Sequence, residues 1–190
     1  MTDTALNNPI VTAVQAVKSG NDIAAVSSSN PLPTGLDERT SPMQAAIAGK
    51  LFGYKLTAPA VSGRYSAVQI WNPVGSGKIL AVFSANGWNS TGTMTWSRVK
   101  QTRALTTASG EALNKRFGSS NAFVGELRYG DLAALDTVNV FGTLSIAVAV
   151  GLGTGTFSGY LIVLEEGQAL EFQGNTQNVG MSIIGDIIQF

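Results

Sequence analysis

GRYSAVQIWNPVGSGKILAVFSANG (residues 63–87) contains two predicted strands and the turn between them. Side chains alternate in character from Tyr65 to Trp71, and the Asn-Pro pair that follows ends this segment. The Gly-Ser-Gly run supplies turn residues, and Lys78 opens the apolar segment ILAVF. The stretch therefore predicts two strands connected by a turn.

The same strand-and-turn pattern continues to the end of the chain. Several short strands without a long amphipathic helix predict an all-β fold, an antiparallel, jelly-roll-like β-sandwich over residues 61–190. The closing sequence IIGDIIQF carries isoleucine on both faces of a strand, which indicates burial on both sides. The further expected strands span 93–99, 122–127, 137–150, 157–164, 169–173 and 179–189.

Residues 101–120 interrupt this pattern and predict a long excursion from the sandwich. Within it, Glu111 to Phe117 is expected to form one or two helical turns. The three tryptophans stand at strand spacing, which favours packing in the core over a sugar-stacking platform. These three residues are Trp71, Trp88 and Trp96.

Residues 1–60 differ from the rest and predict an extended, partly helical N-terminal arm. Prolines are concentrated there, and the run from Ser27 to Pro33 has the composition of a linker. Helical spacing of apolar residues predicts a short helix from Pro9 to Ser19. A second helix is expected to begin at Pro42, because proline suits the first turn of a helix.

The arm has little apolar surface of its own to bury, whereas fixing a backbone costs about 1–2 kcal/mol per residue. We therefore expect it to take its shape by docking on neighbouring subunits in an assembly. The alternative is that it packs on its own domain. The side chains expected to anchor the arm are Leu6, Ile10, Val11, Val14 and Val17, and those expected to make a closing contact with a partner are Ile187, Ile188 and Phe190.

The composition excludes several classes of site. The chain has no histidine and no cysteine, so it can form neither an imidazole relay nor a thiolate nucleophile nor a Cys/His zinc site. We expect no catalytic, cofactor-binding or metal-ligating residues. Its 12 basic and 12 acidic residues balance, which argues against nucleic-acid binding. Scattered carboxylates leave glycoside hydrolysis as a minor alternative.

Two glycine-rich runs resemble nucleotide-binding loops only superficially. Residues 72–78 begin with Asn72 where a phosphate-binding loop needs glycine, and Ile79 replaces its magnesium-binding hydroxyl. Residues 151–156 place Thr156 at the third glycine of a dinucleotide fingerprint. Both runs are therefore interpreted as turns.

The sequence predicts no membrane association. Its first residues, MTDTALNNP, lack the basic start and apolar core of a signal peptide. The longest charge-free stretch, residues 137–164, has the length of a membrane span, but Gly151, Gly153 and Gly155 break it. We interpret it as two strands around a turn.

Residues 63–87, with LEEGQALEFQGNTQNVGMSI at 164–183, resemble a family of small structural proteins of tailed bacteriophages. The shared features are the QxWNPxGSGK turn followed by an apolar strand, and the glycine turn before two closing strands. The resemblance implies a β-sandwich without cofactor or catalysis, in a homo-oligomer that contacts portal or neck, capsid or tail proteins. It also implies a place in the virion, as a collar, neck, capsid-surface or tail component, with assembly in the host bacterial cytoplasm.

A receptor- or glycan-binding module of a fibre or tail is the alternative function. It predicts a cluster of exposed aromatic side chains in the 84–96 turn or in the 101–120 excursion.

Overall fold

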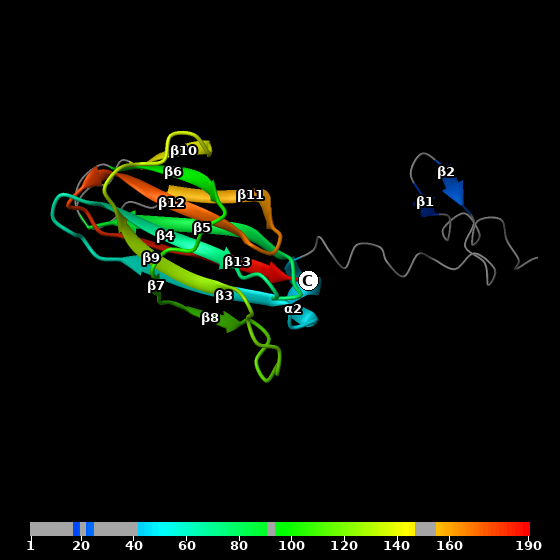
Figure 1. Ribbon diagram of the computed structural model, residues 1–190. Coiled ribbons are helices and arrows are strands. Elements are labelled where there is room, and N and C mark those ends of the chain that lie inside the picture. Colours follow the sequence, from blue (N-terminus) through cyan, green and yellow to red (C-terminus); the bar gives the residue numbers. More distant parts are fainter. Residues whose placement is uncertain (1–16, 20–21, 25–41, 91–93, 147–154) are drawn as a thin grey trace, which may run out of the picture. The chain divides into compact units, whose positions relative to one another are not determined.

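A computed structural model of the chain describes residues 17–19, 22–24, 42–90, 94–146 and 155–190 (Figure 1). The chain divides into two compact units, Met1–Glu38 and Arg39–Phe190.

The first unit contains a pair of short antiparallel strands, β1 (Val17–Ser19) and β2 (Asp22–Ala24). The helix expected from Pro9 to Ser19 is therefore wrong over its last three residues. Their backbone pairs with β2, so the hydrogen bonds run between strands instead of along a helix. The start of that expected helix, residues 9–16, lies outside the described residues.

The second unit is an antiparallel β-sandwich of two sheets, as predicted. One sheet has six strands in the order β10-β6-β12-β4-β9-β7, and the other has five in the order β11-β5-β13-β3-β8. The strands are β3 (Leu51–Ala58), β4 (Tyr65–Asn72), β5 (Leu80–Asn89), β6 (Met94–Gln101), β7 (Thr107–Ala108), β8 (Glu111–Asn114), β9 (Glu126–Leu132), β10 (Val140–Ile146), β11 (Gly155–Leu164), β12 (Gln168–Gln177) and β13 (Met181–Gln189).

The strand order is that of a jelly roll. Eight strands, β3 to β6 and β10 to β13, alternate between two four-stranded sheets, β3-β13-β5-β11 and β4-β12-β6-β10. The segment between β6 and β10 is an insertion that adds β8 to the edge of one sheet, and β9 and β7 to the edge of the other. The excursion that the sequence predicted is the first half of this insertion.

Two details of the insertion differ from the sequence-based expectation. Glu111–Asn114 forms the edge strand β8 instead of a helical turn, because it pairs with β3 from Lys55 to Phe52. The strand expected at 122–127 begins only at Glu126, where β9 starts to pair with β4. In both places the free edge of an existing sheet determines where the backbone finds its partners.

The core lies between the sheets. Trp96 is its largest fully buried side chain, and Gly87 on the facing sheet leaves the space that the indole ring occupies. Alternate residues of the central strands supply the rest. They include Tyr54, Leu56, Ile70, Leu80, Leu170, Phe172, Met181, Ile183 and Ile187.

The helix α2 (Pro42–Ile47) was predicted and covers one end of the five-stranded sheet. It ends in a Schellman motif, in which Gly49 at φ 68° donates to Ala46 O and Lys50 donates to Ala45 O. Ala45 packs on a small second cluster that contains Leu51, Ala81 and Ile188.

The domain boundary expected at residue 60 differs from the structural one, which lies near Arg39. The reason is β3, which pairs along its whole length with β13 and is an inner strand of its sheet. Residues 42–58, assigned above to the arm, therefore belong to the sandwich.

Candidate functional site

The QxWNPxGSGK turn is closed by a carboxylate from the other end of the chain. The backbone N–H groups of Gly75 and Gly77 donate to Glu166 Oε2 and Oε1 at 2.9 and 2.7 Å. Both glycines have positive φ, 82° and 65°, which turns their N–H groups toward one anion. Asn72 Nδ2 secures the base of the turn by donating to Lys78 O and Leu164 O. We call this arrangement the Glu166 clasp.

The clasp explains why residues 72–78 resemble a phosphate-binding loop. Two backbone N–H groups do converge on an anion there, but the anion is the protein's own Glu166. A side chain of the same protein therefore occupies the anion position of the loop, and this contact holds the turn in shape.

A buried polar cluster lies on the outer side of the six-stranded sheet. Glu171 is fully buried, and it accepts hydrogen bonds from Gln69 Nε2 at 2.9 Å and Gln173 Nε2 at 2.6 Å. The guanidinium of Arg103 lies 3.8 Å from its Oε1. Burial raises the pKa of Glu171, while Gln173, Arg103 and Gln69 oppose that shift.

Both ends of the insertion are attached to this cluster. Leu105 N donates to Gln69 Oε1 at 2.9 Å, and Gln69 Nε2 also donates to Arg103 O at 3.0 Å. From the other end, Asp136 N donates to Gln173 Oε1 at 3.0 Å. The cluster therefore fastens the insertion to the sheet, and the burial of Glu171 leaves that carboxylate no open face for a substrate.

Asp136 completes the attachment of the second end. Its side chain accepts bonds from Val138 N, Asn139 N and Gln101 Nε2 at 2.9, 3.3 and 2.8 Å. The two backbone donors are the main cause that lowers the pKa of Asp136.

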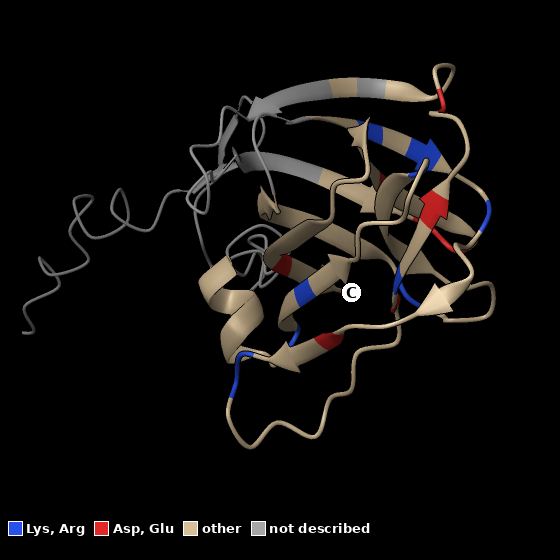
Figure 2. Cartoon of the chain, turned by 90° about the vertical axis from the view of Figure 1, so that its left-hand side faces the viewer, with Lys and Arg blue, Asp and Glu red and all other residues tan. Residues whose placement is uncertain are grey.

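Three further carboxylates of the sandwich have basic partners. Glu126 pairs with Arg128, Asp131 with Arg64 at 2.7 Å, and Asp186 with Lys115. Within the described residues, no three His, Cys, Asp or Glu side chains converge as metal ligands would. Basic and acidic residues lie interspersed over the domain in Figure 2.

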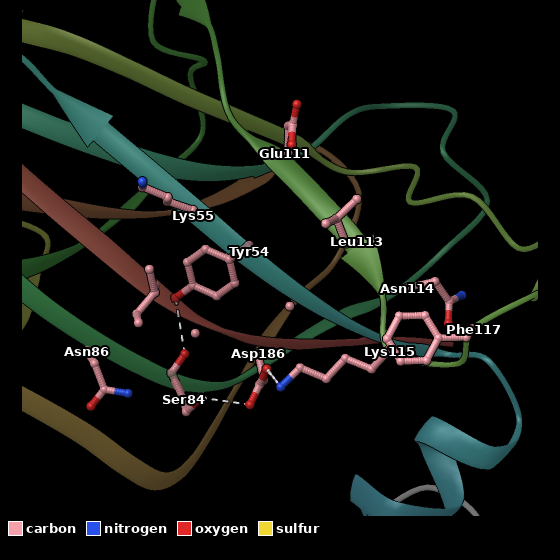
Figure 3. Close-up of a pocket in the computed structure, with 13 residues that line it drawn as sticks. Tyr54, Lys55, Ser84, Asn86, Glu111, Leu113, Asn114, Lys115, Phe117 and Asp186 are labelled. Carbon is pink, nitrogen blue, oxygen red and sulfur yellow. Dashed lines mark hydrogen bonds and ion pairs between the residues drawn. The ribbon is translucent and has the colours of Figure 1, made fainter.

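A shallow hollow of about 760 Å³ lies on the outer side of the five-stranded sheet, and Figure 3 shows the residues that line it. Gly53 contributes no side chain to its floor, so the stem of Lys115 crosses above that residue to reach Asp186. Apolar side chains flank this ion pair. They are Leu113, Ile184 and Phe117, which are 67%, 41% and 100% exposed.

Phe117 stands on a tightly bonded turn that follows β8. Ser119 N donates to Arg116 O at 3.1 Å, and Gly118 at φ 81° occupies the third position of this turn. Arg116 Nη1 donates to Ile47 O at 2.9 Å, and Asn114 Nδ2 donates to Gly49 O at 2.7 Å. The loop therefore caps the C-terminal end of α2 and holds its aromatic ring away from the domain.

Tyr54 lies directly beneath the hollow. Its hydroxyl donates to Ser84 O at 3.1 Å, in space that the missing side chain of Gly185 leaves open (Figure 3). Burial, followed by the charge of Asp186, raises the pKa of Tyr54. Tyr54 is therefore a neutral donor that ties β3 to β5 across β13.

The residues predicted to make assembly contacts are not brought together. Val17 lies in β1, opposite Ala24. Ile187 is buried between the sheets and Ile188 is buried with Ala45 of α2, so the closing contact expected of both with a partner is wrong. Phe190 is half-buried beside Ile188. The remaining predicted anchors, Leu6, Ile10, Val11 and Val14, lie outside the described residues.

The three tryptophans do not form a common platform. Trp96 is in the core, as expected. Trp71 and Trp88 are half-buried, and their strand positions place them on the outer sides of different sheets. The exposed aromatic residue that sequence reasoning missed as a site is Phe117, because its segment was interpreted as a helix. The adjacent Gly118 was the available signal for a turn.

No protein-family model, curated protein or solved structure matches the chain. The described part of the chain contains no helix with the length and apolarity of a membrane span.

Proposed function

We propose that this chain is a non-enzymatic structural subunit of a tailed-bacteriophage virion, at the collar or neck, on the capsid or in the tail. It assembles with copies of itself and contacts neighbouring virion proteins through its N-terminal arm. The observation that carries the proposal is that the two segments that resemble phage structural proteins, 63–87 and 164–183, meet in the Glu166 clasp.

The contact between these two segments supports a mechanical role for the turn motif. β4 and β12 pair in register from Asn72 opposite Gln168 to Ala67 opposite Gln173. The register sets the two turns beside each other, where Gly167 N donates to Asn72 O at 2.8 Å. The shared turn motif thus locks two strands of the sandwich together, which suits a protein that bears load.

The architecture and the composition support the same proposal. Jelly rolls are common in viral capsid domains, although they also occur in lectins, and the fold alone does not decide the function. The sequence has no histidine or cysteine, and only 13% of its residues are charged. A surface of low charge suits a subunit that is covered by its neighbours. Such a subunit would collect in the host cytoplasm before joining the virion.

Mass spectrometry of purified particles, with electron microscopy of particles labelled by an antibody to this chain, tests the proposal. The chain should be present at a fixed stoichiometry, and the label should form a regular pattern. A variant without residues 1–40 should fold, because the sandwich begins near Arg39, but should not join particles. Absence of the chain from purified particles would refute the proposal.

One observation favours the glycan- or receptor-binding alternative. Phe117 is a single exposed aromatic residue in the excursion where that alternative predicts a cluster. A glycan array and a cell-adsorption assay with wild type and Phe117→Ser separate the two functions. Phe117-dependent binding to glycans or cells would support the alternative.

A further inference from the structure

We propose that the hollow-bearing face of the five-stranded sheet binds the same face of a second copy of this chain. In this contact, Phe117 of each copy lies against the hollow of the other, around a twofold axis near β8. The inference rests on the proposed role as a self-assembling subunit and names the surface that would be used.

Phe117 is the first argument. Its ring is fully exposed, although an aromatic side chain buries about 150–250 Å² when it is covered. The turn that carries it is fixed by bonds from Arg116 to Ile47 O and from Asn114 to Gly49 O. Because these bonds hold the turn before any partner arrives, docking of the ring costs little conformational entropy. A central aromatic anchor on a fixed turn is typical of a protein–protein contact.

The hollow is the second argument. Leu113 and Ile184 place exposed apolar surface beside Phe117, on the same face of the sheet. Gly53 has no side chain to fill the floor of the hollow between these residues. A ring from another molecule would therefore cover apolar side chains that water now contacts.

The charges on this face identify the occupant. Lys55 and Lys115 lie beside Glu111 and Asp186, so the face carries two positive and two negative side chains. A strongly acidic or strongly basic partner would gain no net electrostatic attraction from a face with equal numbers of positive and negative side chains. A second copy fits it, because a twofold axis can bring the positive residues of one face against the negative residues of the other.

The pairing of β3 with β8 places Lys55 opposite Glu111 at the rim of this face. β8 is also the last strand of its sheet among the described residues, so its outer edge adjoins the proposed axis. Both features fit an isologous contact, in which the same surface patch of each copy meets that of the other.

Sedimentation velocity of the full chain over a range of concentrations tests the proposal, with Phe117→Ser as the variant and Val138→Ser as the matched control. Val138 is also highly exposed, at 86%, and precedes β10 in the other sheet. Loss of an interface anchor weakens association at least about tenfold. We expect this weakening of self-association for Phe117→Ser and not for Val138→Ser. Both variants should unfold at the wild-type temperature, because neither side chain packs in the core.

Site-specific cross-linking gives a second measurement, which is clean because the chain has no cysteine. Under mild oxidation at low protein concentration, Leu113→Cys should form a disulfide-linked dimer. Val138→Cys, treated identically, should remain uncross-linked. Equal cross-linking of the two variants, or none in Leu113→Cys, would overturn the proposed axis.

Other outcomes separate this inference from the proposed function. If the chain is monomeric at every concentration, or if Phe117→Ser associates like wild type, this face does not bind a second copy. If Phe117→Ser self-associates normally but no longer joins particles, the face binds another virion protein, so the second-copy contact is wrong while the virion role stands. If the chain is absent from particles but Phe117→Ser still weakens self-association, only the virion role fails.

Discussion

Glu166 Oε1 accepts a hydrogen bond of 2.7 Å from the backbone N–H of Gly77, a residue 89 positions earlier in the chain. The other oxygen of the same carboxylate accepts from Gly75 N at 2.9 Å. One side chain thus accepts the N–H groups of two turn glycines from a distant segment of the chain. The two turns on either side of this contact are therefore a single structural device.

Replacing Glu166 by alanine should release this turn. Hydrogen bonds to a charged group contribute about 1.5–3 kcal/mol when buried, but this carboxylate is exposed, so we expect a loss of about 1–2 kcal/mol. Chemical denaturation measures the free energy of unfolding. Glu165→Ala is the matched control, because the neighbouring carboxylate makes only one long bond, 3.5 Å from Gln168 Nε2. Equal losses in the two variants would show that the clasp has no special role.

Replacing Gly87 by alanine should be much more costly. A Cβ atom at this position would lie 1.4 Å from Cη2 of Trp96, which is fixed in the core. Overpacking of this kind costs about 3 kcal/mol or more. Gly130→Ala is the control, because its nearest neighbour is the flexible side chain of Leu105 at 3.3 Å, and we expect a loss within about 1 kcal/mol.

A double variant tests the assigned cause. Trp96→Leu removes the atoms that a Cβ at position 87 would meet, so alanine at 87 should cost less in that background than in wild type. An equal cost in both backgrounds would mean that the indole ring is not the obstacle.

The sandwich could be predicted because its signals are local. The alternation from Tyr65 to Trp71, the Asn-Pro end and the apolar run after Lys78 are each contained in a few residues, and β4 and β5 lie there. The partner of the turn between them could not be predicted in this way. It depends on the register of β4 with β12, which places Glu166 beside Gly77 only after the sheet has formed.

The insertion marks the limit of sequence reasoning most clearly. The segment EALN has a local preference for helix, because Glu, Ala and Leu are good helix formers, but the edge of β3 overrides it and the segment pairs as a strand. Likewise, Glu171 is one of several scattered carboxylates in the sequence. It is buried because segments around Leu105 and Asp136 bond to its neighbours Gln69 and Gln173. Contacts between residues so far apart in the sequence produce no pattern in the local spacing of residues.

Replacing Tyr54 by phenylalanine should remove a tie between β3 and β5. The lost bond is the one that Tyr54 donates to Ser84 O, and its loss leaves that carbonyl without the tyrosine donor. We expect a loss of about 0.5–1.5 kcal/mol in thermal or chemical unfolding. Tyr65→Phe, at a half-buried tyrosine in β4, is the control and should change stability by less than about 0.5 kcal/mol. A Tyr54→Phe variant as stable as wild type would contradict this role.

The buried carboxyl of Glu171 should make stability depend on pH. Because burial raises its pKa in the folded protein, the folded state binds more protons than the unfolded state just above the ordinary glutamate pKa. The free energy of unfolding should therefore fall as pH rises through that window. The Asp136 carboxyl has the opposite effect. Its pKa is lowered in the folded protein, so its contribution to the free energy of unfolding is lost as pH falls through that lowered pKa.

Denaturant unfolding from about pH 2 to about pH 7 separates the two groups, because the Asp136 contribution is lost below the ordinary aspartate pKa and the Glu171 contribution above the ordinary glutamate pKa. Glu171→Gln should lack the decline with rising pH, and Asp136→Asn should lose less stability at the acid end than wild type does. Glu165→Gln, which changes an exposed carboxylate away from both groups, is the matched control. If Glu171→Gln follows the wild-type profile, the carboxyl beneath the insertion does not titrate in this range, and burial does not control its protonation.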